Sequence, residues 1–113
     1  MTINDSNVTI MVKDIDLAIS FYQSIGFTVK NRWGNYYAQI SAPGITIGLH
    51  PSKGTPNTSE NISIGFIVDD LSEAKKRLEE LKIGHEERTE EGGNFIHFKD
   101  SDGTPLYFIN PKR

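Results

Sequence analysis

The sequence has no cysteine among its 113 residues. This absence excludes disulfides, thiolate metal sites and a cysteine nucleophile, so stability has to come from packing. No apolar run approaches the roughly 20 residues that a membrane-spanning helix needs, and the polar start MTINDSN lacks the basic and apolar regions of a signal peptide. We therefore expect a cytoplasmic protein that has no membrane partner.

Clustered positive charge is missing as well. The net charge is −3, with four basic and three acidic side chains in residues 1–56 and eight basic and twelve acidic ones in residues 57–113. Binding to a phosphate backbone needs a basic surface, so nucleic acid is not an expected partner. Hydrophobic residues make up 36% of the chain and charged residues 24%, which is typical of a soluble globular domain.

One phrase occurs twice in the chain. The first copy, VTIMVKDIDLAISFYQSIG, covers residues 8–26, and the second, IGFIVDDLSEAKKRLEELK, begins at residue 64. At an offset of 56 residues, eight positions of the two copies match in character. Each copy changes from alternating apolar residues to apolar residues three or four apart, which indicates a strand followed by a helix. The repeat therefore predicts a βα unit that is used twice.

Three strands are predicted after each helix. Asp14 is expected to cap the first helix, which ends at Gly26. Asp70 and Glu73 resemble a capping box at the second helix, which Gly84 is expected to stop. The later strands are expected at residues 27–33, 36–41, 45–50, 85–89, 94–99 and 105–110. Each half is thus a βαβββ module, and the fold class is α+β.

We expect the two modules to form a single domain that covers residues 1–113. Module 1 spans about residues 3–51 and module 2 about residues 61–113. Between them, the stretch at about residues 52–60 is rich in proline, glycine and small polar residues, which is typical of a linker.

Together these features resemble the vicinal oxygen chelate superfamily, which includes glyoxalase I, extradiol dioxygenases, fosfomycin resistance transferases, methylmalonyl-CoA epimerases and bleomycin-binding antibiotic resistance proteins. The resemblance rests on the segments VKDIDLAISFYQSIGF, VDDLSEAKKRLEELKIG and DSDGTPLYFIN. It implies a curved eight-stranded cup with helices on the convex side and a ligand in the concave side, and it implies a homodimer. Membership of this superfamily specifies a fold and leaves the function open.

The metal-dependent members of this superfamily hold a divalent cation at four positions. They use a histidine or glutamine near the start of each module's first strand and a glutamate on each module's last strand. The matching positions of this chain carry Asn7, Gly48, Ser63 and Tyr107. An amide, a hydroxyl, a phenol and a glycine cannot offset the dehydration of a divalent ion. We therefore expect no metal or other cofactor, and the superfamily's usual chemistry then lacks its electrophile.

The leading interpretation is a metal-independent protein that binds a small, partly aromatic molecule in the cup, as the resemblance to bleomycin resistance proteins implies. Flat aromatic side chains beside an amide suit a planar organic ligand, because stacking provides affinity and a few polar groups fix its orientation. No catalytic residue is assigned. The residues expected to bind the ligand are Asn7, Trp33, Tyr37, Gln39, His50, Phe95, His97 and Tyr107.

Several alternatives remain open at this point. The protein is alternatively a lyase, isomerase or dioxygenase-type enzyme in which His50 or His97 is an unconventional metal ligand or general base, or an accessory domain without a ligand. Trp33 is alternatively a dimer or rim contact, and Tyr36 a core residue. The glutamates around Arg88 form either a solvated strand end or an acidic rim for a cationic ligand.

Overall fold

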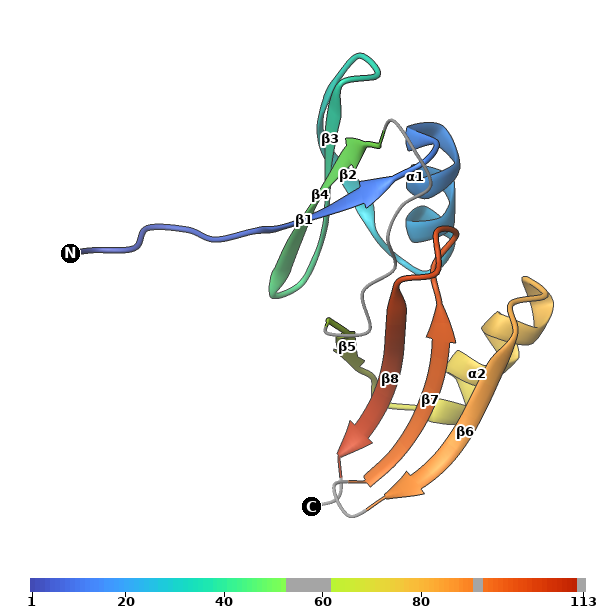
Figure 1. Ribbon diagram of the computed structural model, residues 1–113. Helices are drawn as coiled ribbons and strands as arrows, with labels where there is room; N and C mark the ends of the chain where they lie inside the picture. The colour runs from blue at the N-terminus through green and yellow to red at the C-terminus, as the bar shows by residue number, and fades with distance from the viewer. Residues whose placement is uncertain (53–61, 91–92, 112–113) are drawn as a thin grey trace. The chain divides into compact units, whose positions relative to one another are not determined.

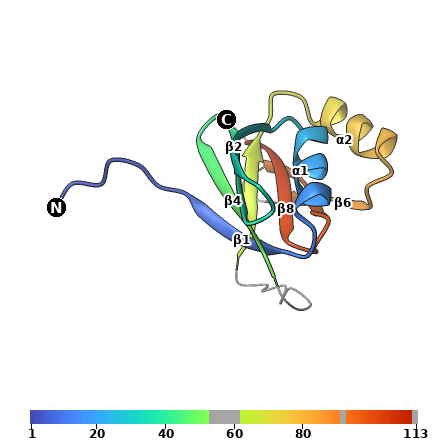
Figure 2. The same ribbon diagram turned by 90° about the horizontal axis from the view of Figure 1, so that it is seen from above.

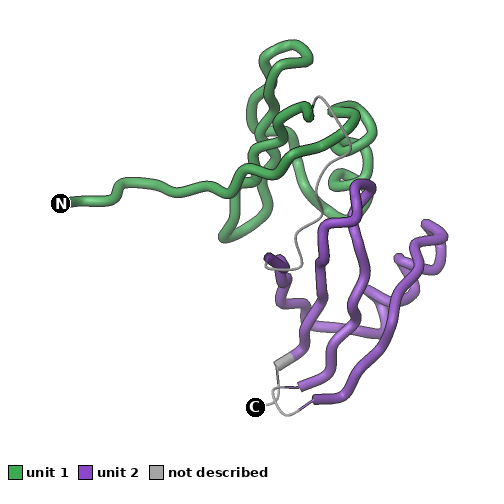
Figure 3. Tube along the Cα trace, viewed as in Figure 1, with its two compact units in different colours: residues 1–57 green, residues 58–113 purple. Residues whose placement is uncertain are grey.

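The computed structural model describes residues 1–52, 62–90 and 93–111, and these form two helices and eight strands in two four-stranded sheets. The chain divides into two compact units, Met1–Asn57 and Thr58–Arg113 (Figure 3). Each unit holds one βαβββ module, which confirms the predicted α+β fold. Of the predicted linker, only Ser52 is among the described residues. Neither helix in these ranges is long and apolar enough to cross a membrane.

Unit 1 contains one mixed sheet and one helix. Its elements are β1 (Val8–Val12), α1 (Ile15–Ser24), β2 (Thr28–Trp33), β3 (Tyr37–Ala42) and β4 (Ile45–Pro51). The sheet has the order β1-β4-β3-β2, in which β1 runs parallel to β4 and the remaining pairs are antiparallel. In Figures 1 and 2, residues 1–7 run away from β1. At each end of the six later strands, the predicted bound differs from the observed one by no more than one residue.

Unit 2 repeats this topology. Its elements are β5 (Ile64–Ile67), α2 (Leu71–Glu80), β6 (His85–Glu90), β7 (Gly93–Lys99) and β8 (Pro105–Pro111). The sheet order is β5-β8-β7-β6, again with a parallel first pair. Figure 1 shows α2 on one side of this sheet. The duplicated phrase therefore gives two equivalent edge strands, β1 and β5.

Alternation along the strands divides each sheet into a helix-facing side and an open face. The residues that alternate toward the helices are largely buried and form the two cores. The helices pack on this side because a helix of ten residues is marginal in water until its apolar side docks. Val8 belongs by alternation to the helix-facing side, on which burial is expected, but it begins β1 and stays 38% exposed. Buried strand residues on the helix sides are Ile10, Val12, Ala38, Ile40, Ile47, Leu49, Ile64, Ile96, Phe98, Leu106 and Phe108.

Both helices begin at the predicted aspartate. The Asp14 carboxylate accepts a hydrogen bond from the backbone N–H of Leu17 at 3.0 Å. The Asp70 carboxylate accepts from the N–H groups of Ser72 at 2.9 Å and Glu73 at 3.2 Å. These bonds satisfy backbone donors that a first helical turn leaves free.

The two helices end in the same way with different residues. Gly26 has φ +113°, and its N–H donates to the Gln23 carbonyl. Lys82, 56 residues later, has φ +58° and donates to the Glu79 carbonyl. The prediction that Gly84 stops the second helix is therefore wrong: the left-handed position is two residues earlier and is occupied by a lysine. Left-handed geometry is unfavourable for a side chain with a Cβ by roughly 1–2 kcal/mol.

Replacing Lys82 by glycine should stabilise the protein. We expect the free energy of unfolding to rise by about 0.5–1 kcal/mol, because relief of the left-handed strain exceeds the added freedom of the unfolded chain. Lys76→Gly, at an exposed position inside α2, is the matched control and should lower it by about 1 kcal/mol. Urea unfolding measures both, and a loss of stability in Lys82→Gly would show that the position is not strained.

Candidate functional site

The open face of unit 1 carries aromatic and polar side chains. The strand register aligns Thr9 with Gly48, and Gly48 with Gln39. Two further pairs on this face are Met11 with His50 and Trp33 with Tyr37. Four of the predicted ligand-binding residues, namely Trp33, Tyr37, Gln39 and His50, thus come from three strands of one sheet.

Trp33 and Tyr37 form an aromatic shelf on this face. Their rings stack with centroids 5.6 Å apart and planes 29° from parallel. Trp33 remains 51% exposed, which leaves ring surface available to a ligand. Tyr36, the neighbouring turn residue, is 83% exposed, so its interpretation as a core residue is wrong.

Polar groups next to the shelf are held in fixed orientations. The Asn31 side-chain amide donates to the Gln39 amide oxygen at 3.1 Å. His50 Nδ1 lies 2.9 Å from the Pro51 carbonyl oxygen. A carbonyl can only accept, so Nδ1 carries the proton in this hydrogen bond and the Nε2 of a neutral ring is an acceptor. Asn7 lies just outside β1 and is exposed, and none of these contacts involves it.

Tyr37 also occupies the space above Gly48. Its hydroxyl lies 3.4 Å from Thr9 Oγ1, so the ring reaches from β3 across β4 to β1. A Cβ built on Gly48 would overlap the Tyr37 hydroxyl and lie 2.7 Å from Thr9 Oγ1. The glycine is therefore needed for this placement of the ring.

The open face of unit 2 has its own aromatic cluster, formed by Phe95, His97 and Tyr107. The rings of Phe95 and His97 stack with centroids 5.8 Å apart and planes 14° from parallel. Tyr107 lies 5.8 Å from each of the other two rings. His97 Nε2 is buried and has no hydrogen-bond partner within the described residues. The predicted residues of module 2 thus form one contiguous surface.

A glycine makes room for the tyrosine of this face as well. Gly65 on β5 pairs with Tyr107 on β8. A Cβ built on Gly65 would fall within the phenol ring and lie 2.5 Å from its hydroxyl oxygen. In both units a tyrosine ring therefore covers a glycine on an adjacent strand.

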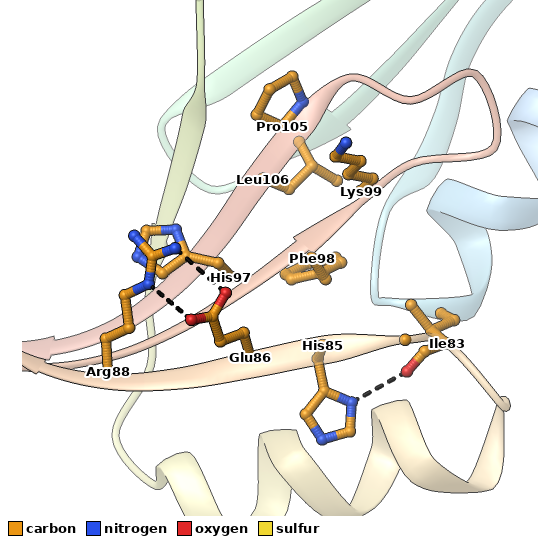
Figure 4. Close-up of a pocket in the computed structure, with 10 residues that line it drawn as sticks. Ile83, His85, Glu86, Arg88, His97, Phe98, Lys99, Pro105 and Leu106 are labelled. Carbon is orange, nitrogen blue, oxygen red and sulfur yellow. Dashed lines mark hydrogen bonds and ion pairs between the residues drawn. The ribbon is translucent and has the colours of Figure 1, made fainter. Parts of the chain in front are cut away.

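A hollow of about 420 Å³ lies beside the aromatic cluster of unit 2, and we call it the β6–β7 pocket (Figure 4). Arg88 binds Glu86 within it through two hydrogen bonds, from Nε at 3.2 Å and from Nη2 at 3.1 Å. Hydrogen bonding and charge from Arg88 lower the pKa of Glu86, and Glu86 raises the pKa of Arg88 by the same means. The pocket is lined by Glu86, Arg88, His97, Lys99, Pro105 and Leu106, among others.

The other glutamate of this strand with a close cationic partner is Glu87. It forms an ion pair with Lys75 of α2, which lowers the pKa of Glu87 and raises that of Lys75, first through the hydrogen bond and then through charge. With Glu86 and Glu87 both paired, β6 offers much less uncompensated negative charge than its sequence indicates. The acidic-rim interpretation loses its main support, and Glu91 lies outside the described residues.

Comparison with known families decides the classification. Residues 6–108 match the model of the Glyoxalase/Bleomycin resistance protein/Dioxygenase superfamily. The chain belongs to this superfamily. A curated relative, an uncharacterized protein of Mycolicibacterium smegmatis, is 27% identical over 77 residues; the match spans 64% of this chain and 61% of that protein's length.

Solved structures of the superfamily share the fold. A bleomycin-binding protein in complex with bleomycin has a TM-score of 0.76 at 20% identity, with 97% of this chain and all of that one covered. A bleomycin resistance determinant encoded on the transposon Tn5 has a TM-score of 0.77 at 19% identity, covering 98% and 100%. The fosfomycin resistance protein FosX of Listeria monocytogenes has a TM-score of 0.82 at 20% identity, covering 99% and 96%.

The divalent ion of metal-dependent superfamily members does not fit the residues of this chain. At the two last-strand positions stand Gly48, with the Tyr37 hydroxyl above it, and Tyr107, whose ring lies against Gly65. Asn7 and Ser63 at the first-strand positions are exposed neutral groups. Among the described residues, no three His, Asp or Glu side chains gather as a metal-binding group. The four ligand positions of this chain therefore offer neutral donors or none, and tyrosine side chains fill the space at two of them.

Sequence reasoning did not select Thr9, Gly65, Arg88 and Lys99 as site residues, and it considered Glu86 only in the acidic-rim alternative. Glu86 and Arg88 are two apart on a strand and therefore share a face, which is the signal that could have identified their pairing. The role of Gly65 had no such signal, because its partner Tyr107 is 42 positions away in the chain.

Proposed function

We propose that this superfamily member binds a small, partly aromatic molecule on the open faces of its sheets and does so without the usual divalent metal. The observation that carries the proposal is that a tyrosine ring covers a glycine in each unit and takes the space in which a metal-dependent relative needs a carboxylate. Aromatic surface next to a few oriented polar groups is the composition that binding sites for planar organic ligands use.

Relatives support this choice of function. One superfamily structure is a bleomycin-binding protein and another a bleomycin resistance determinant. Both are about one-fifth identical to this chain, so they support the kind of function and do not name its ligand. Bleomycin is thus the first probe to test. The homodimer and the cytoplasmic location stay predictions.

Ligand binding should change the fluorescence of Trp33, the single tryptophan of the chain. We expect titration with bleomycin, or with planar aromatic molecules if bleomycin does not bind, to shift the emission, with EDTA leaving the affinity unchanged. Trp33→Ala, followed by NMR titration because it removes the only tryptophan, should weaken binding about tenfold, since the exposed ring of the shelf is lost. Tyr36→Ala, in the adjacent turn, is the control and should change affinity less than twofold. Binding that no Trp33 variant affects would contradict the proposal.

A second candidate is an enzyme that uses a histidine in an unconventional role. The hydrogen bond from His50 Nδ1 to Pro51 favours it, because it leaves Nε2 as a free acceptor suited to a general base or a metal ligand. Elemental analysis of untagged protein separates the two candidates. A stoichiometric divalent metal that is lost on replacing both His50 and His97 by glutamine would favour the enzyme.

A further inference from the structure

The β6–β7 pocket carries more positive than negative charge. The described residues that line it include one carboxylate, on Glu86, and two permanent cations, on Arg88 and Lys99. Glu86 is engaged by Arg88, whereas the Lys99 ammonium has no ion-pair partner within the described part of the chain. Glu90, further along β6, also raises the pKa of Arg88 through its charge, as the smallest of the causes, and it does not line the pocket. The charge that remains favours an anion.

Arg88 is held in a geometry suited to an oxyanion. A guanidinium has five N–H donors in one plane, and Glu86 takes one from Nε and one from Nη2. The two donors of Nη1 and the second donor of Nη2 remain, and they lie along the edge that binds carboxylate or phosphate in a bidentate manner. Glu86 is thus a positioning residue, because it fixes the plane of the guanidinium (Figure 4).

His97 connects this charged pocket to the aromatic cluster. It lines the pocket and stacks on Phe95. It also faces Glu86 across the β6–β7 pair. A ligand ring placed against the cluster therefore has its substituents next to the pocket, within one unit.

We propose that the β6–β7 pocket binds the acidic group, a carboxylate or a phosphate, of an aromatic ligand, with Arg88 as its binding cation. This inference rests on the proposed binding function and specifies the chemical class of the ligand. The aromatic part lies against Phe95 and His97, and the oxyanion accepts hydrogen bonds from the free edge of Arg88.

Three simple probes test the proposal by NMR titration of the full chain. Benzoate and phenyl phosphate carry the two oxyanions, and benzamide has the ring of benzoate without its charge. We expect benzoate or phenyl phosphate to bind about tenfold more tightly than benzamide, because hydrogen bonds to charged groups are the stronger ones. The tighter of the two anions identifies which oxyanion the pocket prefers. Equal affinity for benzamide and both anions would overturn the inference.

Variants distinguish a specific contribution of the Arg88 guanidinium to anion affinity from an effect of the protein's net charge. Glu86→Gln/Arg88→Gln keeps the net charge and should reduce anion affinity about tenfold, to the level of benzamide. Glu86→Gln alone retains Arg88 but weakens the pairing that fixes its plane, and it should bind the anions more tightly than the double variant. Lys75→Gln removes one positive charge from the ion pair with Glu87, outside this pocket, and should change affinity less than twofold. Unchanged anion affinity in the double variant would overturn the inference.

The outcome also distinguishes failure of this inference from failure of the proposed function. If benzamide perturbs Phe95, His97 and Tyr107 as strongly as the anions do, aromatic binding stands and the anion site is rejected. If none of the probes, nor any other planar aromatic molecule, perturbs the open face of either unit, the proposed function itself is rejected.

Discussion

Leu78→Ala is expected to lower the free energy of unfolding by about 2–5 kcal/mol, as a leucine truncated inside a packed core does. Leu78 is fully buried and is the only buried residue of α2 in the described structure. By comparison, α1 is anchored by four buried side chains, Ile15, Ala18, Ile19 and Tyr22. Removal of Leu78 therefore takes away the main anchor of α2 and leaves a cavity under it.

Leu78→Ala should also destabilise α2 locally, in addition to lowering the global free energy of unfolding. A ten-residue helix does not persist in water without its docking side chain, so far-UV circular dichroism should show lost helix, and hydrogen exchange should be faster in α2 than in α1. Leu17→Ala is the matched control, because Leu17 is a helix residue that is 59% exposed, and its replacement should stay within about 0.5 kcal/mol. A Leu78→Ala variant that loses less than 1 kcal/mol would show that α2 is held by other contacts.

Gly65→Ala should destabilise the protein by about 1–3 kcal/mol, because the new methyl group overlaps the Tyr107 ring. The tyrosine side chain can leave only by giving up its contacts with Phe95 and His97. In a Tyr107→Ala background the same substitution should be neutral or stabilise by up to about 1 kcal/mol, since alanine restricts the unfolded chain more than glycine does. The two substitutions should therefore be strongly non-additive.

A double-mutant cycle measured by urea unfolding gives this coupling directly. Gly84→Ala is the control, since a Cβ at Gly84 meets nothing within 4 Å, and its cost should be the same with and without Tyr107. Additivity of Gly65→Ala and Tyr107→Ala within about 0.5 kcal/mol would show that the ring does not rest on Gly65. The single variant should also weaken aromatic binding to unit 2, because it displaces one ring of the cluster.

Local signals in the sequence specified most of the fold. The offset of 56 residues, the change from alternation to helical spacing, and the capping aspartates Asp14 and Asp70 predicted both βαβββ modules, with strand bounds close to those observed. These signals depend on side chains a few residues apart. Such short-range preferences act before any distant contact forms and can therefore be read directly from the chain.

The end of the second helix, at Lys82, was predicted at the wrong residue because a local signal was misleading there. A glycine two residues later offered a stronger local signal, while the packing of α2 placed the left-handed residue where the first module has Gly26. The lysine therefore takes a left-handed conformation that is unfavourable for a residue with a Cβ. Tyr36 was also assigned wrongly as a core residue. Its aromatic side chain favours burial, but the turn in which it lies leaves it exposed.

By itself, then, the sequence determined the two modules, their faces, and the neutral groups at the positions where related proteins hold a metal. Only the tertiary structure decided how these groups meet: that Tyr37 lies over Gly48 and that Tyr107 lies over Gly65. The physical reason is that alternation fixes which face a side chain takes, whereas its neighbours across the sheet depend on the register between strands that are distant in sequence.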